Sequence, residues 1–243
     1  MAIRLDKFLA KTYSNYSRNK IQQFIQVGYV SVNDKVVTQP NHMVDEQDKV
    51  VLNLDNKQLW VSRGAYKLLE AIKHWNINLK NKVCLDIGCS TGGFSQVMLK
   101  HGAKKVYALD VGTDQFDKSL LSNKVILREK THFLHTHANE FAKLDFIACD
   151  VSFISATKII NHVVEMFNYP FTFVCLIKPQ FELTKEILDK CKGSIPETYH
   201  QQAITKVCSF ATNLGLKCSD VIKSPIQGAK SSNTEYLVYL TKE

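Results

Sequence analysis

The sequence lacks any long hydrophobic run. A helix that crosses a membrane needs about 20 consecutive apolar residues, and the most apolar stretch here, residues 171–177, is far shorter and is typical of a buried strand. The first seven residues alternate charged and apolar side chains, whereas a signal peptide needs a continuous apolar segment there. The sequence therefore predicts no membrane partner and a cytoplasmic protein.

Paired cysteines are also missing. The chain has seven cysteines, an odd number, and none of them forms a Cys-x-x-Cys pair, so neither a disulfide framework nor a typical zinc site is expected. In a cytosolic chain they are interpreted as reduced thiols, most of them small core residues. His132, His135 and His137 lie close together, but no second pair of ligands accompanies them. We expect a solvated turn there and no bound metal.

What the chain does have is a globular composition with a surplus of positive charge. It has 243 residues, 45% of them hydrophobic and 10% aromatic. That composition argues against disorder and allows one large domain or two modest ones. Lysine and arginine number 31 against 23 aspartates and glutamates, which gives a net charge of +8. Such a surplus favours a polyanionic partner such as nucleic acid.

The first 57 residues form a distinct segment. Apolar residues recur at helical spacing from Leu5 to Tyr13 and again after Ser17, which is a typical helix N-cap, and Gly28 is placed to end the second helix. Short strands are predicted at 29–32, 35–37 and 50–52, with a turn at 33–34. Residues 1–35 carry six cations against two carboxylates. A solvated helix face is the ordinary explanation of such a charge run.

Three motifs in this segment point to a more specific role. Residues 4–9 (RLDKFL), 17–21 (SRNKI) and 28–33 (GYVSVN) together resemble the S4-type RNA-binding domain of ribosomal proteins, pseudouridine synthases and RNA methylases. The resemblance covers about residues 3–52. It implies that the basic helix pair binds structured RNA through phosphate contacts and shape. The expected RNA-binding cations are Arg4, Lys7, Arg18, Lys20 and, beyond this segment, Arg63.

From residue 63 to residue 243 the pattern alternates strands and helices. Strands are predicted at 83–87, 105–110, 124–128, 144–150, 171–177, 216–222 and 235–241, and helices near 65–75, 92–101, 155–168 and 198–213. This alternation predicts a parallel sheet covered on both faces. The last two strands are joined by a loop too short for a helical crossover, so the final strand should be antiparallel.

The predicted fold class is therefore α/β with a small companion domain. We expect an α+β domain of the S4 type at 1–57, a linker at 58–62, and a Rossmann-like methyltransferase domain with a seven-stranded sheet at 63–243.

A glycine-rich loop follows the first strand of that sheet. Residues 85–94 read LDIGCSTGGF, a form that differs from the GxGxxG of dinucleotide-binding folds and lacks the lysine of phosphate-binding loops. An acidic residue inside the motif would repel phosphates and suits a cationic cofactor without phosphate, such as S-adenosylmethionine. An acidic end of the second strand can bind ribose hydroxyls. The predicted cofactor-binding residues are Asp86, Gly88, Ser90, Thr91, Gly92, Gly93, Phe94 and Asp110.

Four polar residues are expected at the edge where the parallel strands end. Lys67 precedes the first strand, Asp150 ends the fourth, Lys178 ends the fifth and Glu235 opens the last. The fourth-strand sequence DVSF differs from the Asn/Asp-Pro-Pro-aromatic motif of amine methylases, and Cys149 is not placed as a pyrimidine nucleophile. What remains is a lysine-rich site able to deprotonate a hydroxyl. Any one of these residues alone fits a surface ion pair, whereas four in coordinated places favour a reaction centre.

Segments along nearly the whole chain resemble the TlyA family, often called hemolysin A, whose methylase domain is of the FtsJ-like ribosomal RNA type. They are residues 60–67 (WVSRGAYK), the glycine loop, residues 150–155 (DVSFIS) and residues 178–182 (KPQFE). The resemblance carries a Lys-Asp-Lys-Glu tetrad onto the four residues above. It implies S-adenosylmethionine-dependent 2′-O-methylation of cytidine ribose in ribosomal RNA or a ribosomal subunit. The N-terminus starts almost at the first helix and resembles the subgroup associated with large-subunit RNA only.

Two other functions stay open at this point. A non-catalytic RNA-binding factor for ribosome assembly would share the N-terminal module and the positive charge. A pore-forming protein, which the hemolysin name suggests, would need a spanning segment or a strongly amphipathic surface helix, and the sequence supports neither. Binding of S-adenosylmethionine separates the enzyme from the assembly factor.

Overall fold

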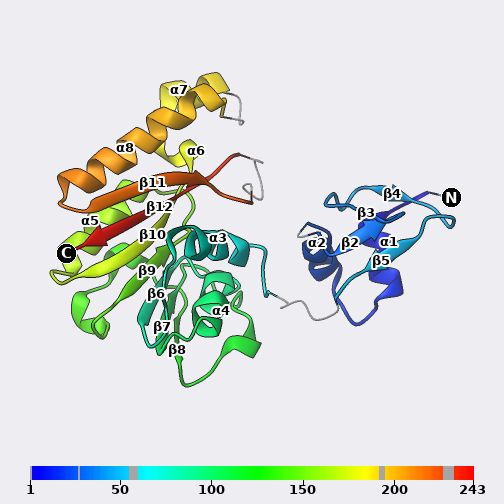
Figure 1. Ribbon diagram of the computed structural model, residues 1–243, viewed down its shortest axis with the longest axis horizontal. Coiled ribbons are helices and arrows are strands. Elements are labelled where there is room, and N and C mark those ends of the chain that lie inside the picture. The colour runs from blue at the N-terminus through cyan, green and yellow to red at the C-terminus, as the bar shows by residue number, and fades with distance from the viewer. Residues whose placement is uncertain (1, 27, 55–59, 192–194, 227–232) are drawn as a thin grey trace. The chain divides into compact units, whose positions relative to one another are not determined.

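The computed structural model describes residues 2–26, 28–54, 60–191, 195–226 and 233–243. The chain folds into two compact units, Met1–Arg63 and Gly64–Glu243 (Figure 1), which we call the N-terminal unit and the C-terminal unit. The linker predicted at 58–62 lies partly outside the described residues. Within the described part of the chain, no helix has the length and apolar character needed to cross a membrane.

The N-terminal unit has the helix, helix, hairpin, strand order that the sequence predicts. Its elements are β1 (Ile3–Arg4), α1 (Leu5–Thr12), α2 (Arg18–Gln26), β2 (Val30–Val32), β3 (Lys35–Val36), β4 (Met43–Val44) and β5 (Val50–Leu52). The strands β3, β2 and β5 form one antiparallel sheet, and β1 pairs separately with β4. The β1–β4 pair was not predicted, because strands of two residues are too short to show a period of alternation.

Local signals explain why these elements begin and end where they do. The Ser17 hydroxyl accepts a hydrogen bond from the backbone nitrogen of Lys20 at 3.2 Å, as an N-cap should. Gly28, at φ +79°, ends α2 in the left-handed conformation that favours glycine. Asn33 and Asp34 both have positive φ, which suits the tight turn between β2 and β3. The core of the unit is Leu5, Leu9, Ile21, Phe24, Ile25, Tyr29, Val30, Val32, Val44 and Leu52.

The C-terminal unit is a seven-stranded sheet covered by helices on both faces (Figure 1). Its strands are β6 (Val83–Ile87), β7 (Lys105–Leu109), β8 (Val125–Arg128), β9 (Phe146–Cys149), β10 (Phe171–Ile177), β11 (Lys217–Lys223) and β12 (Tyr236–Lys242). Its helices are α3 (Ala65–Trp75), α4 (Gly93–Lys100), α5 (Ala156–Met166), α6 (Pro179–Glu182), α7 (Lys185–Cys191) and α8 (His200–Asn213). Short 3-10 turns lie at Lys118–Leu120, Phe133–His135, Ala138–Glu140 and Glu197–Tyr199.

The strand order is β11-β12-β10-β9-β6-β7-β8, and β12 runs antiparallel to its neighbours. The predicted α/β class and the antiparallel last strand are therefore confirmed. The strands β6 to β10 are parallel and end at one edge. Tyr236, the first residue of β12, pairs with Ile177, the last residue of β10. The start of β12 thus lies at the same edge as the ends of the parallel strands, which is where polar residues from distant segments can meet.

Candidate active site

Four side chains from distant segments meet at this edge of the sheet. Lys67 lies in the first turns of α3, Asp150 follows β9, Lys178 follows β10, and Glu235 precedes β12. The Nζ atom of Lys67 donates to Asp150 Oδ2 at 2.8 Å and to Glu235 Oε2 at 2.7 Å. The Nζ atom of Lys178 lies 2.7 Å from Asp150 Oδ1. The structure thus brings together all four residues that the sequence analysis selected.

The charges of this cluster interact strongly because their side chains are largely buried. The side chains of Lys67, Lys178 and Glu235 are 9%, 8% and 3% exposed, and that of Asp150 is 18% exposed. Burial opposes the charge of Asp150, but the two lysines outweigh it and lower the pKa of Asp150 to about 2. Burial likewise opposes the charge of Lys67, and its two carboxylate partners outweigh it and raise the pKa of Lys67. Two cations and two anions therefore balance in a site that excludes most water.

The two lysines of the cluster differ in their surroundings. Lys67 contacts two carboxylates. Lys178 contacts one carboxylate, and its second described partner is the neutral hydroxyl of Ser152, whose Oγ lies 3.1 Å from Nζ. A second negative partner favours the charged form of an amine. Lys67 is therefore held as a cation, whereas Lys178 has one carboxylate partner fewer among the described residues.

An exposed aromatic ring follows Asp150 closely in the chain. Phe153, three residues after Asp150, is 82% exposed and has φ +66°. Its ring lies 5.4 Å from that of Phe181 in α6. A bulky residue with positive φ stores backbone strain, and such strain is found mostly at functional sites. Sequence reasoning gave Phe153 no role of its own, although an aromatic residue next to a catalytic carboxylate was the available signal.

The glycine loop lies between β6 and α4, beside the cluster. Gly88 has φ +81°, and a Cβ atom there would lie 3.0 Å from the backbone oxygen of Asp150. Gly92 has φ +89°, and a Cβ atom there would lie 2.8 Å or less from the side chains of Phe116 and Leu120. Glycine is thus required at both positions, at Gly88 because the loop passes close to the reaction centre and at Gly92 because apolar side chains pack against it.

The other loop residues divide between exposed and buried positions. Ser90 is exposed with φ +45°, and Thr91 is half-buried. Gly93 and Phe94 begin α4 and are buried. The carboxylate of Asp110, at the end of β7, accepts hydrogen bonds from the backbone nitrogens of Ser90 at 2.8 Å and Gly112 at 2.7 Å. Asp110 therefore fixes the shape of the loop, a role that sequence reasoning did not give it.

Asp86 lies under the loop and is only 1% exposed. Its Oδ2 accepts a hydrogen bond from Ser95 Oγ at 2.6 Å, whereas its buried Oδ1 has no hydrogen-bond partner among the described residues. Burial, with help from the charges of Asp150 and Asp110, raises the pKa of Asp86 to about 7. Three carboxylates thus converge near the glycine loop. The two lysines already balance the charge of Asp150, and the acidic groups of Asp86 and Asp110 at the loop fit a cationic ligand and disfavour a phosphate.

In the N-terminal unit, a buried carboxylate joins two of the predicted RNA-binding cations. The Asp6 side chain is fully buried, and its oxygens accept hydrogen bonds from Arg4 at 3.1 Å, Arg18 at 2.8 Å and Gln22 at 2.6 Å. Burial opposes the charge of Asp6, and these donors outweigh it and lower its pKa. The Arg4 and Arg18 side chains remain 41% and 47% exposed. Sequence reasoning missed the role of Asp6. The available signal was a carboxylate in the same segment as the arginines of the RLD and SR motifs.

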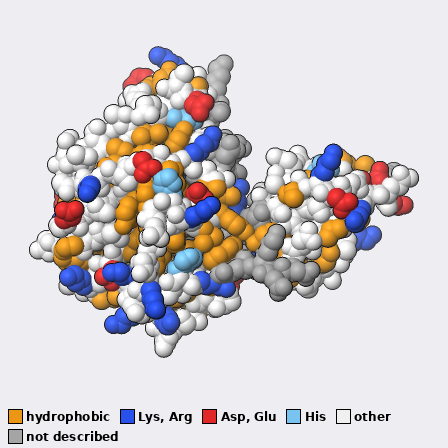
Figure 2. Space-filling model, viewed as in Figure 1, with side chains coloured by type: hydrophobic (Ala, Val, Ile, Leu, Met, Phe, Trp, Pro, Cys, Tyr) orange, Lys and Arg blue, Asp and Glu red, His pale blue; other side chains and the backbone are white. Residues whose placement is uncertain are grey.

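The other predicted cations of the RNA-binding set are arranged differently. Lys7 is exposed on α1. The Nζ atom of Lys20 donates to the backbone oxygen of Trp60 at 3.1 Å and lies 5.5 Å from the centre of the Phe24 ring. Arg63 lies in the turn before α3. Figure 2 shows basic and acidic side chains interspersed on the viewed face of each unit, so net charge alone does not locate an RNA-binding face.

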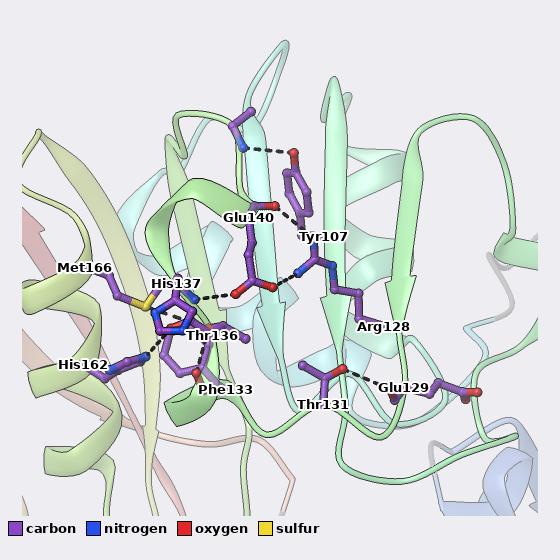
Figure 3. A network of polar contacts seen from close by, with 11 residues as sticks. Tyr107, Arg128, Glu129, Thr131, Phe133, Thr136, His137, Glu140, His162 and Met166 are labelled. Carbon is purple, nitrogen blue, oxygen red and sulfur yellow. Dashed lines mark hydrogen bonds and ion pairs between the residues drawn. The ribbon is translucent and has the colours of Figure 1, made fainter.

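One of the three clustered histidines, His137, belongs to a network of polar contacts with Glu140 and Arg128 (Figure 3). The rings of His132 and His135 stack with their centroids 4.9 Å apart. The backbone nitrogen of His137 donates a hydrogen bond to Glu140, whose carboxylate also accepts a hydrogen bond from Arg128. These contacts fasten the segment after β8 to the sheet. In the ranges that the structure describes, no three His, Cys, Asp or Glu side chains are arranged to hold a metal ion.

Comparison with known proteins places this geometry in context. The family model described as FtsJ-like methyltransferase matches residues 60–242, and the S4 domain model matches residues 3–50. Both matches agree with the two units of the structure.

Full-length relatives carry two kinds of name. Hemolysin A of Brachyspira hyodysenteriae is 38% identical over 98% of this chain and 99% of its own. The 23S rRNA (cytidine-2′-O)-methyltransferase TlyA of Campylobacter jejuni is 35% identical over 99% of this chain and 100% of its own. A solved Streptococcus thermophilus structure, also named for hemolysin, is 32% identical, has a TM-score of 0.74, and covers 99% of this chain and 88% of its own.

Proposed function

The chain belongs to the FtsJ-like methyltransferases that carry an S4 domain, in the TlyA family, and we propose that it transfers a methyl group from S-adenosylmethionine to a cytidine 2′-hydroxyl of ribosomal RNA, with the large-subunit RNA as the preferred substrate. The observation that carries the proposal is the buried cluster of Lys67, Asp150, Lys178 and Glu235 beside the glycine loop. A non-catalytic assembly factor gains nothing from four buried charges, which are costly to desolvate.

The carboxylates around the glycine loop support S-adenosylmethionine as the cofactor. This cofactor supplies a methyl group on a sulfonium, and it carries positive charge. Asp86, when it is ionised, and Asp110 provide negative charge for such a ligand. Asp110 and the residues from Gly88 to Phe94 shape the loop that would hold it.

The proposed chemistry assigns each member of the cluster a task. A ribose hydroxyl is a weak nucleophile at neutral pH, so its proton has to be removed as the methyl group is transferred. Lys178 is the proposed base, because a single carboxylate contacts its amine in the part of the chain that the structure describes. Asp150 orients both lysines, and Glu235 holds Lys67 as the fixed cation. Alignment of the acceptor oxygen with the methyl group supplies a further share of the acceleration.

The exposed ring of Phe153 suits an unstacked base. An enzyme that acts on a nucleotide within folded RNA takes that nucleotide out of its stack, and aromatic rings then support its base. Phe153 offers a ring face beside the proposed base, steadied by Phe181. We expect Phe153→Ala to raise the KM for RNA, because stacking contributes roughly 1–3 kcal/mol per base, while Phe153→Tyr retains most of the affinity.

The N-terminal unit is proposed to supply RNA affinity. Its exposed guanidinium groups, Arg4 and Arg18, are held in place by Asp6 and suit phosphate oxygens, and Lys7, Lys20 and Arg63 add positive charge.

The experiment that tests this function starts from ribosomal RNA without the modification. Purified protein is incubated with isotopically labelled S-adenosylmethionine and with large subunits, small subunits or free RNA from a strain that lacks the gene. Nucleoside mass spectrometry then identifies the product. We expect labelled 2′-O-methylcytidine in large-subunit RNA and none with Lys178→Ala. A label on a base, or cofactor binding without any transfer, would contradict the proposal.

A further inference from the structure

Two described groups contact the amine of Lys178. The Nζ atom lies 2.7 Å from Asp150 Oδ1 and 3.1 Å from Ser152 Oγ. A neutral amine has two N–H bonds and one lone pair. If the two N–H bonds point to Asp150 and Ser152, the lone pair has only the third direction left. A base works only when its lone pair faces the proton that it removes.

The turn that carries Ser152 is fixed from the side of α6. The buried carboxylate of Glu182 accepts hydrogen bonds from Ser155 Oγ at 2.5 Å and from the backbone nitrogen of Ala156 at 2.6 Å, at the start of α5. The rings of Phe153 and Phe181 meet in the same region. Two contacts therefore join the turn at 152–156 to the segment that follows Lys178. Ser152 lies at the start of this turn.

We propose that Ser152 is a positioning residue that, together with Asp150, aims the lone pair of Lys178 at the ribose hydroxyl. This inference rests on the proposed role of Lys178 as the base. The Ser152 hydroxyl accepts a hydrogen bond from the ammonium and from the neutral amine alike, so the aim is kept before and after proton transfer. A second carboxylate at this position would hold the lysine in its charged form, as Glu235 does for Lys67. A neutral acceptor aims the amine without that effect.

The test compares two variants of Ser152 with a control serine. Ser152→Ala removes the acceptor, and Ser152→Thr keeps a hydroxyl on an exposed turn where an added methyl group has room. Ser209→Ala, on the exposed face of α8, is the matched control. Each full-length protein is measured for the single-turnover rate of methyl transfer, for the KM for RNA and for S-adenosylmethionine affinity. Lys178→Ala is measured alongside.

A positioning role predicts a loss of rate without a loss of binding. Ser152→Ala should slow methyl transfer roughly tenfold to hundredfold, because small misplacements of a catalytic group carry losses of that order, with KM and cofactor affinity unchanged. Ser152→Thr should restore most of the rate, and Ser209→Ala should behave as the native protein.

Three outcomes would overturn the inference. A native rate in Ser152→Ala, with Lys178→Ala inactive, would show that the base needs no help from Ser152. An equal loss in the Ala and Thr variants would show that the hydroxyl is not the cause. Retained transfer in Lys178→Ala would remove the base itself, and with it the part of the proposed function on which Ser152 depends.

Discussion

Each unit of the chain contains a buried carboxylate that bridges two cations. In the N-terminal unit, Asp6 joins Arg4 and Arg18, whose side chains are about half exposed. In the C-terminal unit, Asp150 joins Lys67 and Lys178, whose side chains are almost fully buried. In both units a carboxylate bridges two cations, but the cations are half-exposed arginines in the N-terminal unit and buried lysines in the C-terminal unit.

That difference matches two kinds of chemistry. A guanidinium keeps its charge in any protein and presents a planar set of donors that fits phosphate. A buried amine can lose its proton, and burial excludes the water that would compete for it. We therefore interpret the arginine pair as a device for binding a polyanion and the lysine pair as a device for moving a proton. The predictions below test this contrast in order of decreasing effect.

Replacement of the proposed base should have the largest effect. Lys178→Ala and Lys178→Arg should both lower the single-turnover rate of methyl transfer by about a hundredfold to ten-thousandfold, the range that general base catalysis supplies. The Arg variant keeps positive charge but cannot release a proton, so its failure separates proton removal from attraction of RNA. Calorimetry should show native S-adenosylmethionine affinity in both variants. Near-native turnover in Lys178→Arg would transfer the role to Lys67 or to substrate alignment alone.

Asp86 extends the comparison to a buried carboxylate without a cation. Its folded-state pKa of about 7 lies above the ordinary 3.8, so the folded protein holds a proton that the unfolded chain releases. Its contribution to stability is therefore present below about pH 4 and is lost as the pH rises through 7.

Asp86→Asn should remove that dependence. Denaturant unfolding of the two cofactor-free proteins is measured between pH 5 and pH 8. Over this range the free energy of unfolding of the native protein should fall by up to a few kcal/mol relative to that of the variant. S-adenosylmethionine affinity of the native protein should rise over the same range, because the ionised carboxylate attracts a cation. Parallel stability curves for the two proteins would contradict this account of Asp86.

Removal of the charge of Asp6 should have a smaller effect, confined to the N-terminal unit. Asp6→Asn should destabilise that unit by about 1–3 kcal/mol, the usual loss when a buried charged partner is removed. Because the folded-state pKa of Asp6 is lowered, its contribution is present above about pH 4 and is lost as the pH falls further. Amide hydrogen exchange along α1 and α2 of the full chain measures this directly. Unchanged exchange there, or a change spread equally over both units, would show that Asp6 does not organise this unit.

The smallest effects should come from the arginines themselves. Arg18→Ala should weaken RNA binding and flatten the log–log salt dependence of affinity by roughly one unit, as expected for one lost phosphate contact. Arg18→Lys should keep that slope, because the charge remains, in contrast to the failure of Lys178→Arg. An unchanged slope in Arg18→Ala would exclude Arg18 from the RNA contacts.

Periodicity and strand-end logic predicted the sheet and placed Asp150, Lys178 and Glu235 at one edge of it, and the family resemblance joined Lys67 to them as a tetrad. Long buried parallel strands that end at one edge of a sheet leave few alternative topologies and few alternative positions for the polar residues at their ends. The β1–β4 pair and the short helices α6 and α7 were not predicted, because two to seven residues carry too little pattern.

The sequence also did not reveal which side chains contact one another. The sequence selected Gly92 as a cofactor-binding residue but did not show that a Cβ atom there would meet Phe116 and Leu120. The hydrogen bonds of Asp110 to Ser90 and of Asp86 to Ser95 depend on loop geometry that residue types do not reveal. Spacing locates a loop, whereas only three-dimensional contacts show which of its residues face inward.

The most direct test of the proton-transfer account is the pH dependence of the chemical step. The rate of single-turnover methyl transfer to large-subunit RNA is measured from pH 6 to pH 10 with saturating cofactor. Ser209→Ala, the matched control on the exposed face of α8, is measured in the same way. The account predicts a rate that rises with pH and then levels off, because a general base acts only in its deprotonated form. A rate that is the same at every pH, with transfer shown to be the slow step, would contradict a lysine base and leave alignment as the source of catalysis.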